Sequence, residues 1–298
     1  MGQKFEEYKK SNVKIFGFSW ETKKFFLTMG ITLGVLIALV ALTLLGVDIS
    51  WYGVMIGLGF LSALALSQQL FKERDLSSDY PYTLIWWIFP LSIVGARIYF
   101  LIFDGSLNSF WDIVRVWDGG LAIYGGVIGG FAGLVISCLI HKVNIIKTTD
   151  GVAPVLALGQ AFGRIGCIFG KCCYGVKVTN RALQWFPIAL YVHGDYHYAT
   201  NFYESILDLL LFIGLTILLR KVKISGIVTF AYLFGYGIVR FILEFFRDQA
   251  QTLYLGSFPV SQLVSILCVV AGVVGICVLL LVNNKKSANK GATPTKTE

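Results

Sequence analysis

Runs of apolar residues close to the length of a membrane span recur along the whole chain. In hydrocarbon every backbone polar group needs a partner within the protein, so such a segment crosses the bilayer as a helix of about 20 residues. Hydrophobic residues make up 56% of the 298 positions and charged residues only 14%, against roughly 25% charged in soluble domains. The sequence therefore predicts an all-α polytopic membrane protein with about eight transmembrane helices, at 25–46, 50–71, 82–104, 119–140, 151–170, 203–219, 226–246 and 259–282.

Lysine and arginine residues are distributed unevenly between the segments that join these spans. With the N-terminus in the cytoplasm, 17 of the 25 basic residues fall on the cytoplasmic side, five on the other side and three within spans. Basic loops stay in the cytoplasm, so residues 1–24 and the tail 283–298 are both expected there. The longest outer loop, 171–202, is aromatic and polar enough to form a small extracytoplasmic cap. The net charge of +8 follows from this topology and needs no nucleic-acid partner.

Three of the predicted spans each contain one arginine. Arg97, Arg164 and Arg240 all lie seven residues before a charged residue that closes the span. At a helical rise of about 1.5 Å per residue, each guanidinium would lie about 10 Å below the outer membrane surface. An arginine in lipid is costly and faces a partner or a polar cavity. Three at one depth predict an anionic ligand in the outer half of the bilayer.

Two glutamates accompany these arginines. Arg240 and Glu244 are four residues apart, so they share a helix face and can pair. Such a pair could simply neutralise itself in lipid, but one carboxylate cannot neutralise three arginines, which favours an additional anion. Glu204 opens the span at 203–219, where it could cap the helix through the N-terminal dipole.

Glycines dominate residues 119–130, at the outer start of the fourth span. Gly125 begins a stripe of small residues, with Gly126 beside it, which is typical of close helix packing. The same lack of side chains could instead leave room for a lipid headgroup. Tyr124 falls close to the depth of the arginines, where its phenol could donate to a phosphate or only pack. Tyr52 points into the same layer and could equally be an interfacial anchor.

Glycines and cysteines crowd the segment 163–175. Its composition predicts that the helix breaks near the membrane surface, where free backbone N–H groups beside Arg164 could cradle an anion. Cys167, Cys172 and Cys173 could be structural thiols, a disulfide pair or a reactive thiolate activated by nearby cations. No second cluster of metal ligands accompanies them elsewhere, so neither a metal site nor a cofactor is expected.

Several of these motifs together resemble the phosphatidylglycerol–prolipoprotein diacylglyceryl transferases of bacterial inner membranes. The similarity covers about residues 50–282 in the right order, and its specificity lies in the combination of motifs. The motifs are Trp51-Tyr52-Gly53, Gly95-Ala96-Arg97-Ile98-Tyr99, Gly119 to Gly130, Gly163-Arg164-Ile165-Gly166 with Tyr174-Gly175, Tyr203-Glu204, Tyr236-Gly237 with Arg240, Glu244 and Arg247, and Gly256 with Ser261-Gln262.

The resemblance implies transfer of a diacylglyceryl group from phosphatidylglycerol to the lipobox cysteine of a secreted prolipoprotein, with release of glycerol phosphate. Residues 47–282 would form the seven-helix core, with 25–46 as an extra N-terminal helix. Arg164 and Arg240 would hold the phosphate, and Glu244 would orient Arg240. The expected catalytic residues are Tyr124, Arg164, Cys172, Arg240 and Glu244, and the expected substrate-binding residues are Tyr52, Arg97, Gly125, Gly126, Cys167, Gly175, Glu204 and Tyr236.

Four positions depart from the family pattern. Tyr124 stands where the family has an essential His, Cys167 where it has Asn, and Cys172 where it has Glu; Tyr198-Ala199 replaces a His-Pro pair. A phenol with a pKa near 10 is a poor general base at neutral pH. The departures therefore preserve lipid binding better than the usual proton transfer, and leave open a different base, a different acceptor or a covalent intermediate.

The sequence thus predicts a transferase of the bacterial plasma membrane whose active site faces outward. Its expected partners are phosphatidylglycerol, a secreted prolipoprotein and membrane lipid. One alternative keeps the donor lipid but changes the acceptor to another lipid, a glycan or a peptide. The other alternative is a non-catalytic binder of anionic lipid.

Overall fold

The computed structural model describes residues 12–15, 18–21, 34–35, 37–105, 109–248, 254–255 and 258–291. Within these residues, seven helices are long and apolar enough to cross a membrane, which confirms the predicted all-α polytopic class. They are α3 (Trp51–Lys72), α4 (Tyr80–Asp104), α6 (Ile123–Ile140), α7 (Ile145–Phe169), α8 (Thr200–Lys221), α9 (Ile227–Glu244) and α10 (Val260–Gly291).

The predicted spans from 50 onward each match one of these helices. Of the predicted extra helix at 25–46, residues 25–33 and 36 lie outside the described residues, whereas 34–35 and 37–44 are helical. Helix α6 begins at Ile123 instead of 119 because Gly119 and Gly120 take positive φ angles of 79° and 67°. Helix α7 begins six residues earlier than predicted, since the side chain of Asn144 caps it by accepting from the amide of Lys147.

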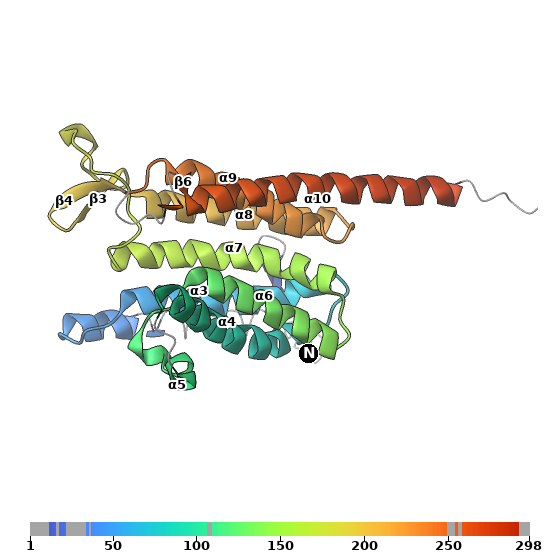
Figure 1. The fold of residues 1–298 in the computed structure, drawn as a ribbon, viewed down its shortest axis with the longest axis horizontal. Helices are drawn as coiled ribbons and strands as arrows, with labels where there is room; N and C mark the ends of the chain where they lie inside the picture. Colours follow the sequence, from blue (N-terminus) through green and yellow to red (C-terminus); the bar gives the residue numbers. More distant parts are fainter. Residues whose placement is uncertain are drawn as a thin grey trace, which may run out of the picture.

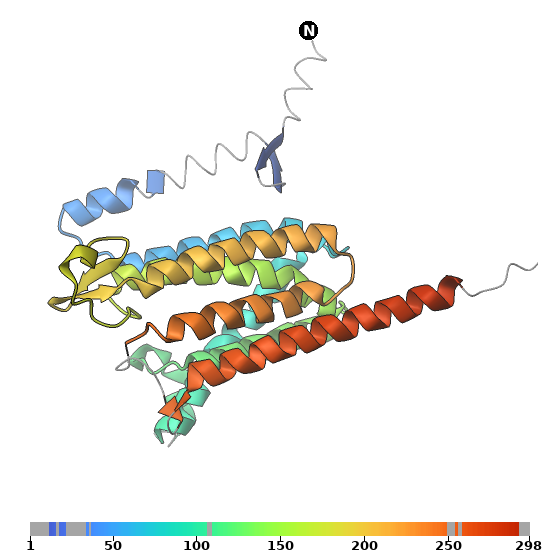
Figure 2. The same ribbon diagram turned by 90° about the horizontal axis from the view of Figure 1, so that it is seen from above.

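Short elements complete the described chain. The strands β3 (Ala189–Val192) and β4 (Asp195–Tyr198) form an antiparallel hairpin within the predicted cap, and α5 (Phe110–Val114) lies in the loop before α6. Both lie at the same end of the helical bundle, whereas α10 projects past the other helices at the opposite end (Figures 1 and 2). The remaining elements are β1 (Asn12–Ile15), β2 (Phe18–Glu21), η1 (Val116–Asp118), η2 (Arg181–Leu183), β5 (Tyr254–Leu255) and β6 (Phe258–Pro259).

Helix α7 is the central element of the bundle. It packs against α3, α8 and α9, and 44% of its membrane-spanning window is buried, more than in any other described span. An apolar core joins the four helices, with Leu70, Leu158, Leu219 and Val228 among its buried side chains. Side chains carried by α7 are therefore held from several directions.

Helices α4 and α6 pack closely through their glycines. A Cβ on Gly125 would overlap the carbonyl oxygen of Gly95, and one on Gly129 would overlap that of Leu91. This supports the packing interpretation of the small-residue stripe. At Gly126 an added Cβ would meet Ser92 Oγ at 3.4 Å, so the contact there is ordinary.

A buried ion pair ties together the loops at the end opposite the β3–β4 hairpin. Arg74 Nη2 lies 3.1 Å from Asp150 Oδ2, and Arg74 also donates to the carbonyl of Val222 at 2.8 Å. The same carboxylate accepts from the amides of Gly226 and Thr229 at 2.8 and 2.9 Å. Because both charged side chains are buried, this network fixes how α3, α7 and α9 leave that end of the bundle.

Candidate functional site

Five charged residues meet near the hairpin end of α7, α8 and α9. Arg164 Nη2 on α7 lies 2.9 Å from Glu204 Oε1 on α8, and Arg240 Nη1 on α9 lies 3.5 Å from Glu204 Oε2. Arg240 Nη2 also pairs with Glu244 Oε2 at 2.8 Å, and Arg247 Nη1 approaches the same oxygen at 3.8 Å. Residues far apart in sequence thus form one cluster, which we call the arginine cluster.

In the arginine cluster the positively charged side chains are more exposed than the negatively charged ones. The side chains of Glu204 and Glu244 are only 3% and 1% exposed, whereas those of the three arginines retain 12–18%. Three arginines against two glutamates leave a formal charge of +1. The part of the cluster that a ligand can reach is therefore cationic, which suits an anion.

Asp208 lies one turn below Glu204 on α8, and the sequence analysis missed it. Its side chain is completely buried, and neither carboxylate oxygen has a hydrogen-bond partner among the described residues. The signal in the sequence was Asn201, Glu204, Ser205 and Asp208 at helical spacing within an apolar span. These residues form a polar stripe that faces the protein interior.

Arg97 is placed apart from the arginine cluster's ion pairs. Its side chain is buried, and Nε donates to the carbonyl of Asp112 at 2.8 Å while Nη1 donates to the carbonyls of Gly119 and Gly120. These acceptors all belong to the α4–α6 connection. The guanidinium therefore holds that connection against α4.

Three tyrosines from three helices interact electrostatically with members of the arginine cluster. Tyr236 on α9 stacks on Tyr232 with ring centroids 5.8 Å apart, and it interacts electrostatically with Glu204, Arg164 and Arg240. Tyr124 on α6 lies 6.3 Å from Tyr99 between ring centroids and within electrostatic range of Arg240 and Glu244. Tyr52 on α3 is 42% exposed and lies near Arg164. The structure thus brings these three predicted site residues around the same charges.

The helix break predicted within 163–175 is present, because α7 ends at Phe169. Helix α7 continues through Arg164 and Gly166 to Phe169, and the amide of Gly170 still donates to Gly166 at 2.9 Å. The cradle of free amides expected in this break is not formed by Gly170, Lys171, Cys172 or Gly175, because the amides of these residues donate to backbone carbonyls. The chain turns only at Lys171 and Cys173, which have φ angles of 49° and 59°.

The segment after this turn connects the hairpin to the arginine cluster. The amide of Gly175 donates to Tyr198 at 2.8 Å, and Gly175 forms a β-bridge with Arg247. A Cβ on Gly175 would lie 2.5 Å from the carbonyl oxygen of Phe246, so a side chain does not fit there. Gly175 thus contributes to the site by letting two backbones meet.

Three free thiols gather between α7 and this segment. The Sγ atoms of Cys167, Cys172 and Cys173 all lie within 4.8 Å of one another, and Arg247 Nη2 lies 3.7 Å from the Sγ of Cys173. The hydrogen bond from the Cys167 thiol, followed by the nearby Arg164 and Arg247 cations, lowers the pKa of Cys173 to about 5. Burial raises the pKa of the Cys172 thiol. Sulfur and cationic groups are therefore neighbours here.

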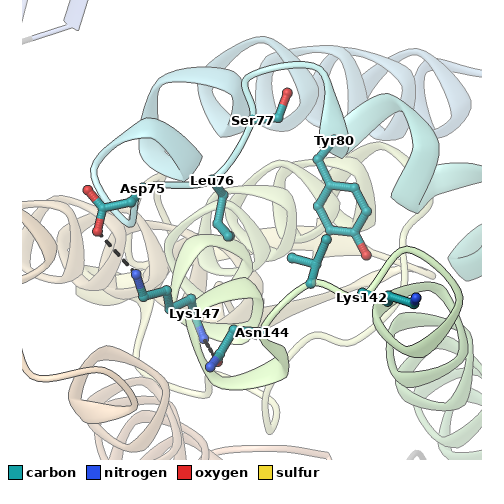
Figure 3. Close-up of a pocket in the computed structure, with 8 residues that line it drawn as sticks. Asp75, Leu76, Ser77, Tyr80, Lys142, Asn144 and Lys147 are labelled. Carbon is teal, nitrogen blue, oxygen red and sulfur yellow. Dashed lines mark hydrogen bonds and ion pairs between the residues drawn. The ribbon is translucent and has the colours of Figure 1, made fainter.

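A separate cavity of about 460 Å³ lies at the other end of the bundle (Figure 3). The loops after α3 and α6 line it, and Lys147 Nζ pairs with Asp75 Oδ2 across its edge at 3.1 Å. That ion pair is exposed and none of the predicted site residues lines this cavity. The chemistry-bearing groups are instead those of the arginine cluster.

The chain is similar to known proteins over most of its length. The family model described as prolipoprotein diacylglyceryl transferase matches residues 39–278. Phosphatidylglycerol–prolipoprotein diacylglyceryl transferase 1 of Clostridium perfringens is 36% identical over 259 residues, which cover 85% of this chain and 97% of that protein. The transferases of Finegoldia magna and Listeria innocua are 37% and 34% identical, over 79% and 78% of this chain and 93% and 87% of their own lengths.

Proposed function

The chain belongs to the prolipoprotein diacylglyceryl transferase family, and on this premise we propose that it uses phosphatidylglycerol to modify prolipoproteins. In this reaction the thiol sulfur of the lipobox cysteine attacks the diacylglycerol carbon that carries the phosphate. The carbon–oxygen bond breaks, a thioether forms, and glycerol phosphate leaves with the bonding electrons. The thiol proton is released to solvent.

The observation that carries this proposal is the cationic, reachable side of the arginine cluster. Arg164 and Arg240 would hold the lipid phosphate, while Glu204 and Glu244 orient both guanidinium groups from below. The phosphate gains negative charge as the carbon–oxygen bond breaks. Prepositioned guanidinium groups therefore stabilise the transition state more than the bound lipid, which is the condition for catalysis.

The three tyrosines would complete the donor site. Tyr124 lies near Arg240 and Glu244 and would donate a hydrogen bond to a phosphate oxygen, since a phenol is a weak base at neutral pH. Tyr236 and Tyr52 would line the headgroup on the α9 and α3 sides. Arg97 would act through the α4–α6 connection that it holds.

The arginine end of the bundle would face outward. The opposite end of the bundle carries Lys72, Arg74, Lys142, Lys147 and the basic pair Arg220-Lys221, as the positive-inside rule expects of the cytoplasmic side. Both termini would then be cytoplasmic. Residues 47–282 would act as the transferase core, with 171–202 as the cap over its outer end.

A glycerol phosphate release assay tests the proposal. Purified protein is given phosphatidylglycerol and a lipobox peptide, and both glycerol phosphate and the thioether peptide are measured by mass spectrometry. Arg240→Ala should lower kcat/KM by about 100- to 1,000-fold, the usual effect of removing one group that stabilises the developing anion. Arg181→Ala is the matched control, because Arg181 is exposed near the same end of the molecule.

Other outcomes discriminate between the alternatives. Release of glycerol phosphate without thioether peptide, together with a modified lipid or glycan, would show that the acceptor is that lipid or glycan and not a prolipoprotein. Phosphatidylglycerol binding with neither product would reject an enzyme and leave a lipid binder. In cells, restoration of lipoprotein thioether in a strain lacking its own transferase should succeed with the wild type and fail with Arg164→Ala.

A further inference from the structure

The three thiols of Cys167, Cys172 and Cys173 form a prearranged sulfur cluster. Their Sγ atoms lie within 4.8 Å of one another. The turn that places them is closed by a hydrogen bond from the amide of Cys172 to the carbonyl of Cys167 at 3.1 Å. From α8, Thr200 Oγ1 donates to the carbonyl of Cys173 at 3.1 Å, and Asn201 Nδ2 donates to that of Cys172 at 3.2 Å.

This backbone arrangement holds the three thiols side by side. Thr200 and Asn201 are buried, so their hydrogen bonds fix the backbone that carries Cys172 and Cys173. Zinc–sulfur bonds of about 2.3 Å in a tetrahedral site place sulfur atoms about 3.8 Å apart. The cluster therefore needs to contract by no more than about 1 Å, which side-chain rotation can provide.

The surrounding charges fit a bound divalent cation. Three thiolates and one Zn²⁺ carry a net charge of −1. Arg247, whose Nη2 lies 3.7 Å from the Sγ of Cys173, and Arg164, which interacts electrostatically with all three thiols, offset that charge. Donors of this kind outside the ligand sphere orient the ligands and tune the metal.

The number of ligands indicates an open site. Within the described residues the group consists of three cysteines, with no fourth His, Cys, Asp or Glu beside them. Structural zinc sites are closed by four protein ligands, whereas catalytic sites have three and leave the fourth position to water or substrate. The sequence argument against a metal asked for a second pair of ligands, which an open site does not need. Cys172 and Cys173 are partly exposed, so the open position is reachable.

We propose that Cys167, Cys172 and Cys173 bind a zinc ion whose fourth ligand is the thiolate of the acceptor cysteine. This inference rests on the proposed function, because it assigns the acceptor side of that reaction. When the acceptor thiol binds, its proton passes to solvent and a zinc–sulfur bond forms, since a thiol coordinated to zinc is deprotonated. Its sulfur then attacks the glycerol carbon, glycerol phosphate leaves with the electron pair, and the neutral thioether dissociates from zinc. No group is oxidised or reduced.

Metal binding is tested on the full-length protein, purified under reducing conditions and loaded with zinc chloride. The wild type should retain one zinc per chain after desalting, measured by mass spectrometry of the metal. Cys167→Ser, Cys172→Ser and Cys173→Ser should each retain much less, whereas Cys268→Ser, on α10, should behave as the wild type. Should a serine variant fold poorly, zinc protection of the three wild-type thiols from maleimide gives the same information.

Cobalt substitution tests the fourth ligand. The sulfur-to-cobalt absorption of the wild type should increase when a lipobox peptide is added, and a peptide with serine in place of its cysteine should cause no change. An unchanged spectrum with the cysteine peptide would overturn the acceptor role. Absence of zinc from the wild type, or a disulfide between two of the three thiols in the reduced preparation, would overturn the site.

Activity separates this inference from the proposed function. If chelated, zinc-free protein releases glycerol phosphate at the zinc-loaded rate, the zinc inference fails and the proposed function stands. If neither form releases glycerol phosphate while zinc and peptide bind, the proposed function fails and the metal site stands.

Discussion

Replacing Glu204 with glutamine tests how much its carboxylate stabilises the arginine cluster. Glu204→Gln removes the carboxylate that pairs with Arg164 at 2.9 Å and Arg240 at 3.5 Å, and it raises the cluster's formal charge from +1 to +2. At an effective dielectric constant of about 20, each contact contributes about 5 kcal/mol before desolvation is subtracted. Removing one partner of a buried pair costs about 3–5 kcal/mol. Because glutamine keeps one acceptor oxygen, we expect Glu204→Gln to lower the free energy of unfolding by about 3 kcal/mol, the lower end of this range.

Thermal unfolding in detergent micelles measures this effect. A loss of about 3 kcal/mol corresponds to a decrease in Tm of about 6 °C for a chain of this size. Phosphatidylglycerol should raise the Tm of Glu204→Gln more than that of the wild type, because the lipid phosphate takes the place of the missing carboxylate. Phosphatidylcholine, which has no net charge, should not distinguish the two proteins.

The matched control is Asp195→Asn in the hairpin. Asp195 pairs with Lys177 at 2.7 Å, but both side chains are about half exposed, so the same carboxyl-to-amide change should alter stability by less than about 1 kcal/mol. The reasoning is refuted if Glu204→Gln unfolds at the wild-type temperature. It is also refuted if phosphatidylglycerol stabilises both proteins equally.

Three further substitutions test other parts of the structure. Asp150→Asn should destabilise the protein by about 3–5 kcal/mol in thermal unfolding, because Arg74 is left buried without a countercharge; KM for phosphatidylglycerol, measured at a permissive temperature, should not change. Gly125→Ala should lower the free energy of unfolding by about 1–3 kcal/mol, because it forces α4 and α6 apart, whereas Gly126→Ala should leave it unchanged. Equal Tm values for these two variants would contradict the packing argument. Arg97→Lys keeps the charge but loses the planar fork that bonds several carbonyls, so hydrogen exchange in residues 109–122 should accelerate, and unchanged protection would exclude its structural role.

Span positions were predictable because their signal is local. Twenty apolar residues in a row can satisfy their backbone in lipid only as a helix, whatever surrounds them. The boundaries were less predictable where side chains override hydropathy. The first two turns of α7 contain Thr148 and Asp150, which look like loop residues but are buried, and Asp150 accepts hydrogen bonds from Gly226 and Thr229.

The charged site was only partly predictable for the same reason. Depth along each helix placed Arg164 and Arg240 in one layer, and the structure joins them through Glu204. Depth alone could not show that Arg97 bonds to the loop before α6, because rotation about the helix axis decides which neighbour a side chain meets. Asp208 was missed although it lies four residues after Glu204; that this polar stripe is buried becomes visible only once the neighbouring helices are placed.

The departures that the resemblance implies spare the charged residues of the site. Arg164, Arg240, Glu204 and Glu244 are all present and form one network. The replacements instead affect a phenol beside that network and two members of the sulfur cluster. A site that prepares its acceptor thiol by coordination has no need of a strong general base, because the cation itself makes the thiolate the stable form. On the proposed zinc site, the tyrosine at position 124 and the thiols at positions 167 and 172 would both follow from one change in how the nucleophile is activated.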